Sequence, residues 1–251
     1  MRGDDSIVRP DHFVRYLRRV VGLRPAETRL PTRAVLVFGG QDFRTLARMV
    51  GAKVLPWNRS MAVGRAGNRR VVVARTTIGA PATAIMIEEM AALGAREFLA
   101  FGACGSLVPR LKIGAIVVPT FAATDEGTSR HYGGAGRARP DTALRAALVR
   151  ACEGRGVPFT EGGTWTMDAV YRETFARARA LAARGVVAVD MEASAIWAVA
   201  RHRGLRAASL FVVSDELGGD GWNPGFRDPA FLDGKRRALR VLVEALAGNS
   251  P

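Results

Sequence analysis

Short apolar runs alternate with longer segments of helical periodicity along most of the chain. The apolar runs are nearly continuous, which is typical of strands whose two faces are both covered. They lie at residues 34–38, 70–74, 96–101, 115–119, 186–189 and 207–213. This pattern predicts a mostly buried central sheet.

The segments between these runs carry apolar residues at helical spacing, and most close near a glycine that can cap a helix. They lie at residues 81–95, 142–156, 174–185, 192–204 and 228–248. The alternation predicts an α/β fold, in which helices flank a mixed, mostly buried central β-sheet. Residues 125–140 and 215–229 stay irregular, and we expect functional loops there.

The chain has 251 residues, of which 48% are hydrophobic, so it can bury one large core. We expect one domain at residues 34–251 and an N-terminal extension, residues 1–33, that packs on it. No stretch reaches the roughly 18 apolar residues of a membrane span, and the N-terminus has no unbroken apolar signal region. We therefore expect a cytoplasmic chain with no membrane partner.

A formal charge of +14 first suggests a nucleic-acid partner. The charge is almost all arginine, however, and it is scattered among Ala, Gly and Val instead of gathered in an arm or stripe. We expect no nucleic-acid partner and favour a small anionic ligand. Cys104 and Cys152 are too few for a disulfide framework and lack the spacing of a zinc site, so no metal is expected.

Open α/β sheets usually bind ligands beyond the carboxyl ends of their strands. After the first run, Gly39 and Gly40 allow backbone amides to approach an anion at a helix start, and Arg44 follows one turn later. After the third run, Cys104 and Gly105 allow close contact with a flat ligand. In isolation, a glycine cap or turn with a surface arginine explains the first stretch better, and that stretch matches no dinucleotide or triphosphate fingerprint. A tight strand-to-loop turn explains the second stretch equally well.

Carboxylates surround the start of the helix expected at 192–204. Asp190 and Glu192 flank Met191, and Asp215 follows the last apolar run. Acidic groups in such apolar surroundings suggest a ligand site at the rim of the sheet. The alternatives are structural: Asp215 as a helix cap or Asx turn, and Glu192 as an acid that interacts with the helix dipole.

Several ordered segments carry a resemblance to a known family. They are "TTIGAPATAIMIEEMAALGA", "FGACGSLVPRLKIGAIVVPT", "DEGTSRHY", "WTMDAVYRET", "VVAVDMEASAIWAVA" and "AASLFVVSDE". Together they resemble the purine nucleoside phosphorylase and uridine phosphorylase family, from about residue 34 to the C-terminal helix. The resemblance implies cleavage of a nucleoside's N-glycosidic bond, usually by phosphate.

The resemblance also implies roles for the carboxylates. Glu192 matches the acid that takes the ribose 2′-hydroxyl, and Met191 matches the methionine that packs on the sugar. A carboxylate beside a developing oxocarbenium ion is stabilising in a water-poor site. Asp190 stands where a glutamate is common, which leaves its role in nucleoside binding open. Asp215 matches the aspartate that hydrogen-bonds or protonates the purine base at N7.

Further positions bear on the base and the sugar. Trp165 matches an aromatic that stacks on the base, although a core role is also open, and His131 is either a sugar contact or a solvated loop residue. Uracil-specific members carry a glutamine and an arginine where this chain has Thr174 and Ala176. A purine is therefore the expected base.

The phosphate site of the family is matched only in part. Gly40 and Arg44 match its glycine and first arginine, and Arg59 matches the arginine that one subunit lends to its dimer neighbour. A third arginine is replaced by Ala100, which weakens phosphate capture. Arg75 is a candidate to fill the gap, but the sequence alone does not place it.

A hydroxyl position of the same site is also lost, to Ala103. The favoured function is phosphorolysis of a purine nucleoside to free base and ribose 1-phosphate, with inorganic phosphate as co-substrate and no cofactor. The expected assembly is a dimer-based homo-oligomer, a hexamer by analogy. The alternatives are a nucleosidase that uses water and a non-catalytic nucleoside- or polyanion-binding module.

Overall fold

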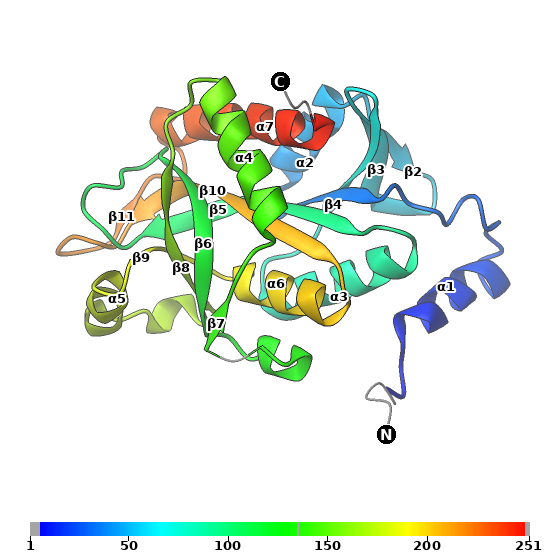
Figure 1. Cartoon of the computed structure of the whole chain (residues 1–251), viewed down its shortest axis with the longest axis horizontal. Helices are drawn as coiled ribbons and strands as arrows, with labels where there is room; N and C mark the ends of the chain where they lie inside the picture. Colours follow the sequence, from blue (N-terminus) through cyan, green and yellow to red (C-terminus); the bar gives the residue numbers. More distant parts are fainter. Residues whose placement is uncertain (1–5, 135, 249–251) are drawn as a thin grey trace.

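The computed structural model describes residues 6–134 and 136–248, and every predicted apolar run forms a strand in it (Figure 1). These strands are β1 (Arg33–Val37), β4 (Arg69–Arg75), β5 (Glu97–Ser106), β6 (Ile116–Asp125), β9 (Val186–Asp190) and β10 (Arg206–Glu216). The prediction of these elements is confirmed.

Other strands have no continuous apolar run. They are β2 (Lys53–Leu55), β3 (Asn58–Ala66), β7 (Arg137–Ala138), β8 (Thr160–Met167) and β11 (Asn223–Pro224). Polar and glycine residues interrupt β3 and β8. The short strands β7 and β11 lie within the two stretches that were expected to be irregular.

Within the described residues the strands form one 11-stranded sheet, in the order β11-β10-β6-β8-β9-β5-β1-β4-β3-β2, and β7 pairs with β6 off this path. Because β10 also pairs with β5, the strands β5, β9, β8, β6 and β10 close a ring. Strands β4, β1, β5 and β10 run parallel to their neighbours in this set, so their carboxyl ends meet at one edge. The mixed sheet confirms the predicted fold class.

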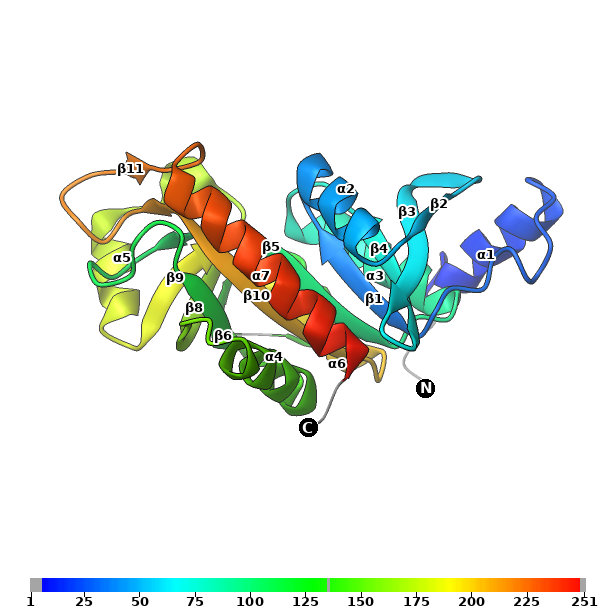
Figure 2. The same cartoon turned by 90° about the horizontal axis from the view of Figure 1, so that it is seen from above.

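Two helical layers cover the sheet (Figures 1 and 2). Helices α2 (Gly40–Met49), α4 (Thr142–Gly154) and α7 (Pro229–Ala247) pack on one face, and α3 (Ala80–Ala92) and α6 (Ala193–His202) pack on the other. In β1, Val35 and Val37 face the first layer while Ala34 and Leu36 face the second. Burial on both faces is why these strands read as continuous apolar runs.

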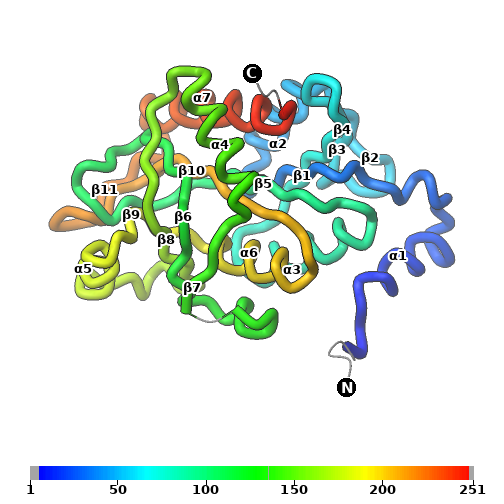
Figure 3. The backbone as a smooth tube through the Cα atoms, in the orientation of Figure 1, coloured from blue at the N-terminus to red at the C-terminus, as the bar shows by residue number. Residues whose placement is uncertain are grey.

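The remaining helices lie at the two ends of the molecule. Helix α5 (Phe175–Ala182) covers a smaller core cluster beside β8 and β9, and α1 (Pro10–Arg19) lies at the far edge, on the side of β2 (Figure 3). Helix α1 packs on α3 and buries Val14 and Leu17. No helix in the described part of the chain is long and apolar enough to cross a membrane.

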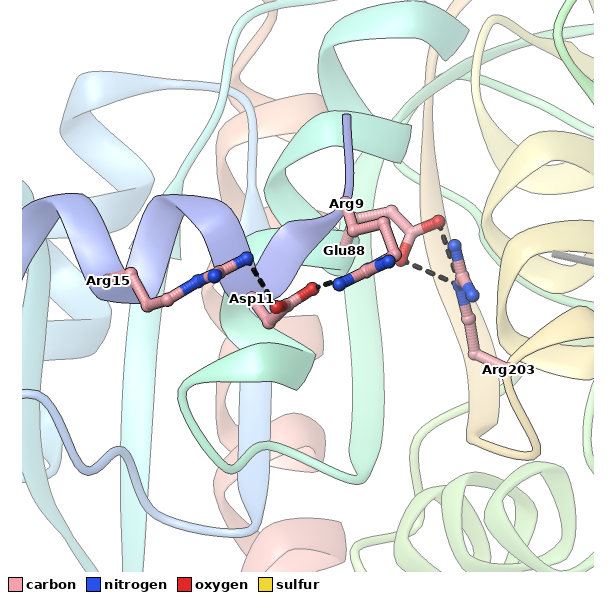
Figure 4. Close-up of polar contacts among 5 residues, drawn as sticks. All are labelled: Arg9, Asp11, Arg15, Glu88 and Arg203. Carbon is pink, nitrogen blue, oxygen red and sulfur yellow. Dashed lines mark hydrogen bonds and ion pairs between the residues drawn. The ribbon is translucent and has the colours of Figure 1, made fainter. Parts of the chain in front are cut away.

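Two groups of ion pairs lie near the contact between α1 and α3 (Figure 4). Asp11 accepts from Arg9 and Arg15, at 3.0 and 3.1 Å. Close by, Glu88 of α3 pairs with Arg203 at 2.9 Å, which links α3 to the end of α6. The α3 and α6 helices that cover one face of the sheet are thus tied to each other.

Candidate active site

A cavity of about 650 Å³ opens where the carboxyl ends of the parallel strands meet. Its volume lies in the usual range for small-molecule sites. The ends of β5, β9 and β10 line it, together with the loops after β1 and β4 and the loop before β11. The structure brings six of the predicted nucleoside-site residues to this cavity: Cys104, Gly105, Asp190, Met191, Glu192 and Asp215.

Glu192 is the residue before α6, and it is only 7% exposed. Its Oε1 accepts a hydrogen bond of 2.7 Å from the backbone N–H of Gly79, the residue that precedes α3. Gly79 has a φ of 114°, a conformation that favours glycine. Burial, together with the charge of Asp190, raises the pKa of Glu192 to about 8, so its carboxyl group is mostly protonated at neutral pH.

Asp190 is buried and has its oxygens fully engaged. The hydroxyls of Thr164 and Thr166 donate to Oδ1 at 2.8 and 2.9 Å, and the backbone N–H groups of Glu192 and Ala193 donate to Oδ2 at 2.8 and 2.6 Å. This side chain therefore joins β8 to the first turn of α6. Because its hydrogen bonds are to β8 and to the start of α6, Asp190 positions Met191 and Glu192.

Asp215 is the penultimate residue of the long strand β10, and both of its carboxyl oxygens have a hydrogen-bond partner. The Ser214 hydroxyl donates to Oδ1 at 2.6 Å, and the Trp222 indole N–H donates to Oδ2 at 2.9 Å. Gly105 lies alongside on β5, where a Cβ would come within 2.3 Å of Leu217 Cδ1 and 3.4 Å of Asp215 Oδ2. A Cβ at this position would therefore require the Leu217 side chain to move.

Glu173 is a site residue that the sequence reasoning missed. Its side chain is half-buried, and it lines both the main cavity and a side cavity of about 110 Å³. Burial and the nearby charge of Asp215 raise the pKa of Glu173 to about 7. The residue lies in the quoted segment "WTMDAVYRET", but nothing in the sequence shows that it faces the same cavity as Asp215.

Cys104 faces the cavity as a buried free thiol. Burial, reinforced by the charges of Asp190 and Asp215, raises the pKa of this thiol well above its usual value. A neutral thiol is a poor nucleophile, so Cys104 lines the site without acting as a nucleophile. Within the described residues, no group of three or more His, Cys, Asp or Glu side chains could hold a metal ion.

Two predicted nucleoside contacts lie outside the main cavity. Trp165 is 1% exposed, donates to Asp125 at 3.0 Å and faces the side cavity; the indole at the main cavity belongs to Trp222. His131 lies on a short 3-10 helix and lines a separate cavity of about 960 Å³ beside α1. The structure does not bring these two residues to the carboxylates.

Two arginines converge at the start of α2. A Cβ placed on Gly40 would lie 3.2 Å from Nη1 of Arg75 and 3.4 Å from Nη1 of Arg44. The first turn of a helix also offers free N–H groups and the positive end of its dipole. Phe38 and Ile78, which line the main cavity, lie in the loops that follow β1 and β4, close in sequence to Gly40 and Arg75. A candidate anion site therefore adjoins the carboxylate cavity.

The position of Arg75 follows from the order of the strands. Ala100 is fully buried on β5 and pairs with Leu36 of β1. Strand β4 pairs with the other side of β1, and it ends in Arg75 opposite Val37. An arginine at the end of β4 can thus reach the same helix start as one from β5. Arg59, at the start of β3, is exposed and does not line the cavity of its own chain.

This fold is that of nucleoside phosphorylases. The purine nucleoside phosphorylase of Toxoplasma gondii has a TM-score of 0.79 at 23% identity, over 90% of this chain and 93% of that one. The uridine phosphorylase of Vibrio fischeri has a TM-score of 0.78 at 23% identity, over 89% and 95% of the two chains.

Residues 32–247 match the family described as the phosphorylase superfamily, and the chain belongs to it. The guanosine phosphorylase of Halorubrum lacusprofundi is 32% identical, over 70% of this chain and 75% of its own length. The DeoD-type purine nucleoside phosphorylase of Myxococcus xanthus is 32% identical over 76% and 82%, and the uridine phosphorylase of Thermococcus kodakarensis is 31% identical over 69% and 68%. The resemblance noted in the sequence is thus confirmed, and nucleoside phosphorolysis is the activity of the superfamily.

Proposed function

We propose that the protein cleaves purine nucleosides with inorganic phosphate, giving the free base and ribose 1-phosphate. The observation that carries this proposal is the position of the carboxylate cavity, which adjoins two arginines at the start of α2. Attack on the anomeric carbon needs an anion beside the sugar and acidic groups around the sugar and base. The two arginines can hold the anion, and the carboxyl groups of the cavity are the acidic groups.

Glu192 and Met191 form the sugar end of the proposed site. Met191 is half-buried at the cavity wall, where its thioether can pack against the ribose. A ribose hydroxyl that donates to Glu192 would favour its ionised form, because a hydrogen bond to the charged carboxylate lowers its pKa. The carboxylate would then stabilise the positive charge that develops on the sugar.

Gly40, Arg44 and Arg75 form the proposed phosphate end. Two guanidinium groups on one anion give charge-assisted hydrogen bonds, and helix N–H groups add to them. Arg75 thereby offers a replacement for the arginine that is absent at Ala100. This arrangement favours phosphorolysis over hydrolysis, since water would need no cationic pair.

Purine is favoured at the base end, where Asp215 would hydrogen-bond the leaving base. The Thr174 hydroxyl accepts from the Arg177 N–H at 3.3 Å as the cap of α5, and Ala176 has no polar side-chain group. Neither offers the glutamine and arginine contacts that a uracil ring would need. Uridine and purine nucleoside phosphorylases both occur among the relatives, so a substrate test is required.

The test is product analysis for inosine, guanosine, adenosine, 5′-methylthioadenosine and uridine, each with and without phosphate. Purine base and sugar 1-phosphate formed only with phosphate would support the proposal. Free ribose released at the same rate without phosphate would instead identify a nucleosidase. Tight nucleoside binding with no turnover would identify a binding module.

We also propose that the active unit is a dimer within a larger homo-oligomer, by analogy a hexamer. The exposed position of Arg59, away from the cavity of its own chain, suits an arginine that serves a neighbouring site. Mixing inactive Arg59→Ala subunits with inactive Glu192→Gln subunits should restore activity at one of the two sites of each mixed dimer, where Glu192 of the first subunit meets Arg59 of the second; the other site carries both substitutions. No recovery after confirmed subunit exchange would contradict the shared site.

A further inference from the structure

A side cavity of about 110 Å³ lies beside the base end of the main cavity. The two cavities share Glu173, Leu217 and Trp222 as lining residues, so the side cavity begins where the base would lie. Its remaining walls come mainly from α5 and from the small core cluster that α5 covers (Figure 1). The side cavity is thus an extension of the proposed base site into the interior of the protein.

The walls of the side cavity are mostly apolar, and most of their polar side chains are already hydrogen-bonded. The indole N–H groups of Trp165 and Trp222 donate to carboxyl groups at 3.0 and 2.9 Å. The Thr174 hydroxyl accepts from a backbone N–H of α5 at 3.3 Å. A buried water typically makes about three hydrogen bonds, and among the described lining side chains Glu173 alone has its polar group unengaged. An apolar group of a ligand therefore suits this cavity better than water.

The position of Asp215 indicates which part of a purine would point toward the side cavity. The group at C6 of a purine lies next to N7 on the same edge of the ring, and N7 is the atom that Asp215 would hold. Trp222 donates to Asp215 at 2.9 Å, and Glu173 is near enough for the charge of Asp215 to raise its pKa. A base that presents N7 to Asp215 therefore directs its 6-substituent toward Glu173 and Trp222, which line both cavities.

We propose that the side cavity binds an alkyl group on the 6-amino nitrogen of the base, so that N6-alkylated adenosines are better substrates than adenosine. The inference rests on the proposed purine nucleoside phosphorylase activity, and it names the substrate class within that activity. An apolar cavity of about 150 Å³ can hold benzene, so a cavity of about 110 Å³ matches a branched alkyl group of about four carbon atoms. The alkylated nitrogen keeps one N–H, which can donate to the half-buried carboxyl group of Glu173.

The test compares adenosine, N6-isobutyladenosine and an adenosine that carries the isobutylamino group at C2, on the opposite side of the ring from N7. Their dissociation constants are measured by calorimetry without phosphate, and kcat/KM is measured with phosphate. Each buried CH₂ group is worth about fourfold in affinity, and ordering the chain offsets part of this gain. We expect N6-isobutyladenosine to bind at least about 10-fold more tightly than adenosine, and the C2 compound to show no gain.

Ala178→Leu tests the location of the alkyl group. Ala178 is buried in α5 and lines the side cavity but not the main one, so a leucine there takes up the space of the alkyl group. The preference for N6-isobutyladenosine should disappear, while kcat/KM for adenosine stays close to that of wild type. Ala180→Leu is the matched control: it lies exposed on the same helix, lines neither cavity and should keep the preference. Ala178→Val is a smaller change, and circular dichroism and thermal melting check the folding of each variant.

The outcomes separate this inference from the proposed function. Phosphate-dependent cleavage of adenosine with no gain for N6-isobutyladenosine would overturn the inference and leave the proposed function intact. An equal gain for the C2 compound, or a preference that survives in folded Ala178→Leu protein, would place the alkyl group elsewhere and also overturn it. Tight binding of N6-isobutyladenosine that depends on Ala178, without phosphate-dependent cleavage of any nucleoside, would support the alkyl site and refute the proposed function instead. The comparison of the C6 and C2 compounds needs only wild-type protein, so it decides the matter even where a variant fails to fold.

Discussion

Glu192→Gln should make the protein more stable at neutral and alkaline pH while it lowers turnover. The carboxyl group of Glu192 is buried, and its pKa is raised to about 8 from an ordinary value of 4.5. Glutamine keeps the shape of the side chain and an oxygen for the Gly79 N–H, but it never ionises. The substitution therefore removes only the free energy of charging this group in the folded state.

The sign follows from proton binding. Between the two pKa values the unfolded chain has lost the proton while the folded chain keeps it, so the free energy of unfolding falls as pH rises. Each pH unit in this window corresponds to about 1.4 kcal/mol. Between about pH 5.5 and pH 7.5, the wild type should lose about 2 to 3 kcal/mol that the glutamine variant does not lose.

The measurement is urea denaturation of both proteins at these two pH values. Glu173, which also has a raised pKa, affects both proteins equally and cancels from the difference. Glu216→Gln serves as the control, because the pKa of Glu216 is lowered and the group stays ionised in both states over this range. A stability difference between Glu192→Gln and wild type that does not change with pH would refute the reasoning.

Three further predictions concern other parts of the site. Arg75→Gln should raise the KM for phosphate by about 10- to 100-fold and barely change the KM for the nucleoside, whereas Arg70→Gln on the same strand should change neither in steady-state assays. Asp190→Ala should lower the free energy of unfolding by about 3 to 5 kcal/mol in urea titrations, because it leaves four donors without their acceptor. Cys104 should resist iodoacetamide in the folded protein and react once it is unfolded, as mass spectrometry would show.

The sequence was sufficient for the strands and helices of the central core. Strands such as β1 and β10 bury both faces, so their apolar runs are continuous and easy to recognise. Strands β3 and β8 were missed because glycine and polar residues interrupt their apolar runs. At least one of these glycines is required by packing. At Gly163, a Cβ would come within 2.3 Å of the Phe121 ring, so close packing against β6 requires a glycine in β8.

The candidate site was predictable where its residues are neighbours in sequence. Asp190, Met191 and Glu192 occupy one strand end, and the resemblance was enough to group them with Asp215. Glu173 was missed, and a base contact and a core role both stayed open for Trp165, because both assignments depend on how the segments around α5 fold. The structure turns Trp165 into the core and brings Glu173 and Trp222 to the cavity.

The arginine at the end of β4 shows why a site can keep its chemistry while its residues move along the chain. Strand β1 has a parallel neighbour on each side: β1 and β4 end together at the edge where α2 begins, and β5 passes that edge at Phe101 before it continues to Ser106. An anion at that helix start can therefore be approached from β5 or from β4. Ala100 on β5 is sealed in the core, and Arg75 on β4 is exposed at the edge beside Gly40. The absence of an arginine from one strand is thus weak evidence against a phosphate site, because strand order, which the sequence does not reveal, decides which side chains can reach it.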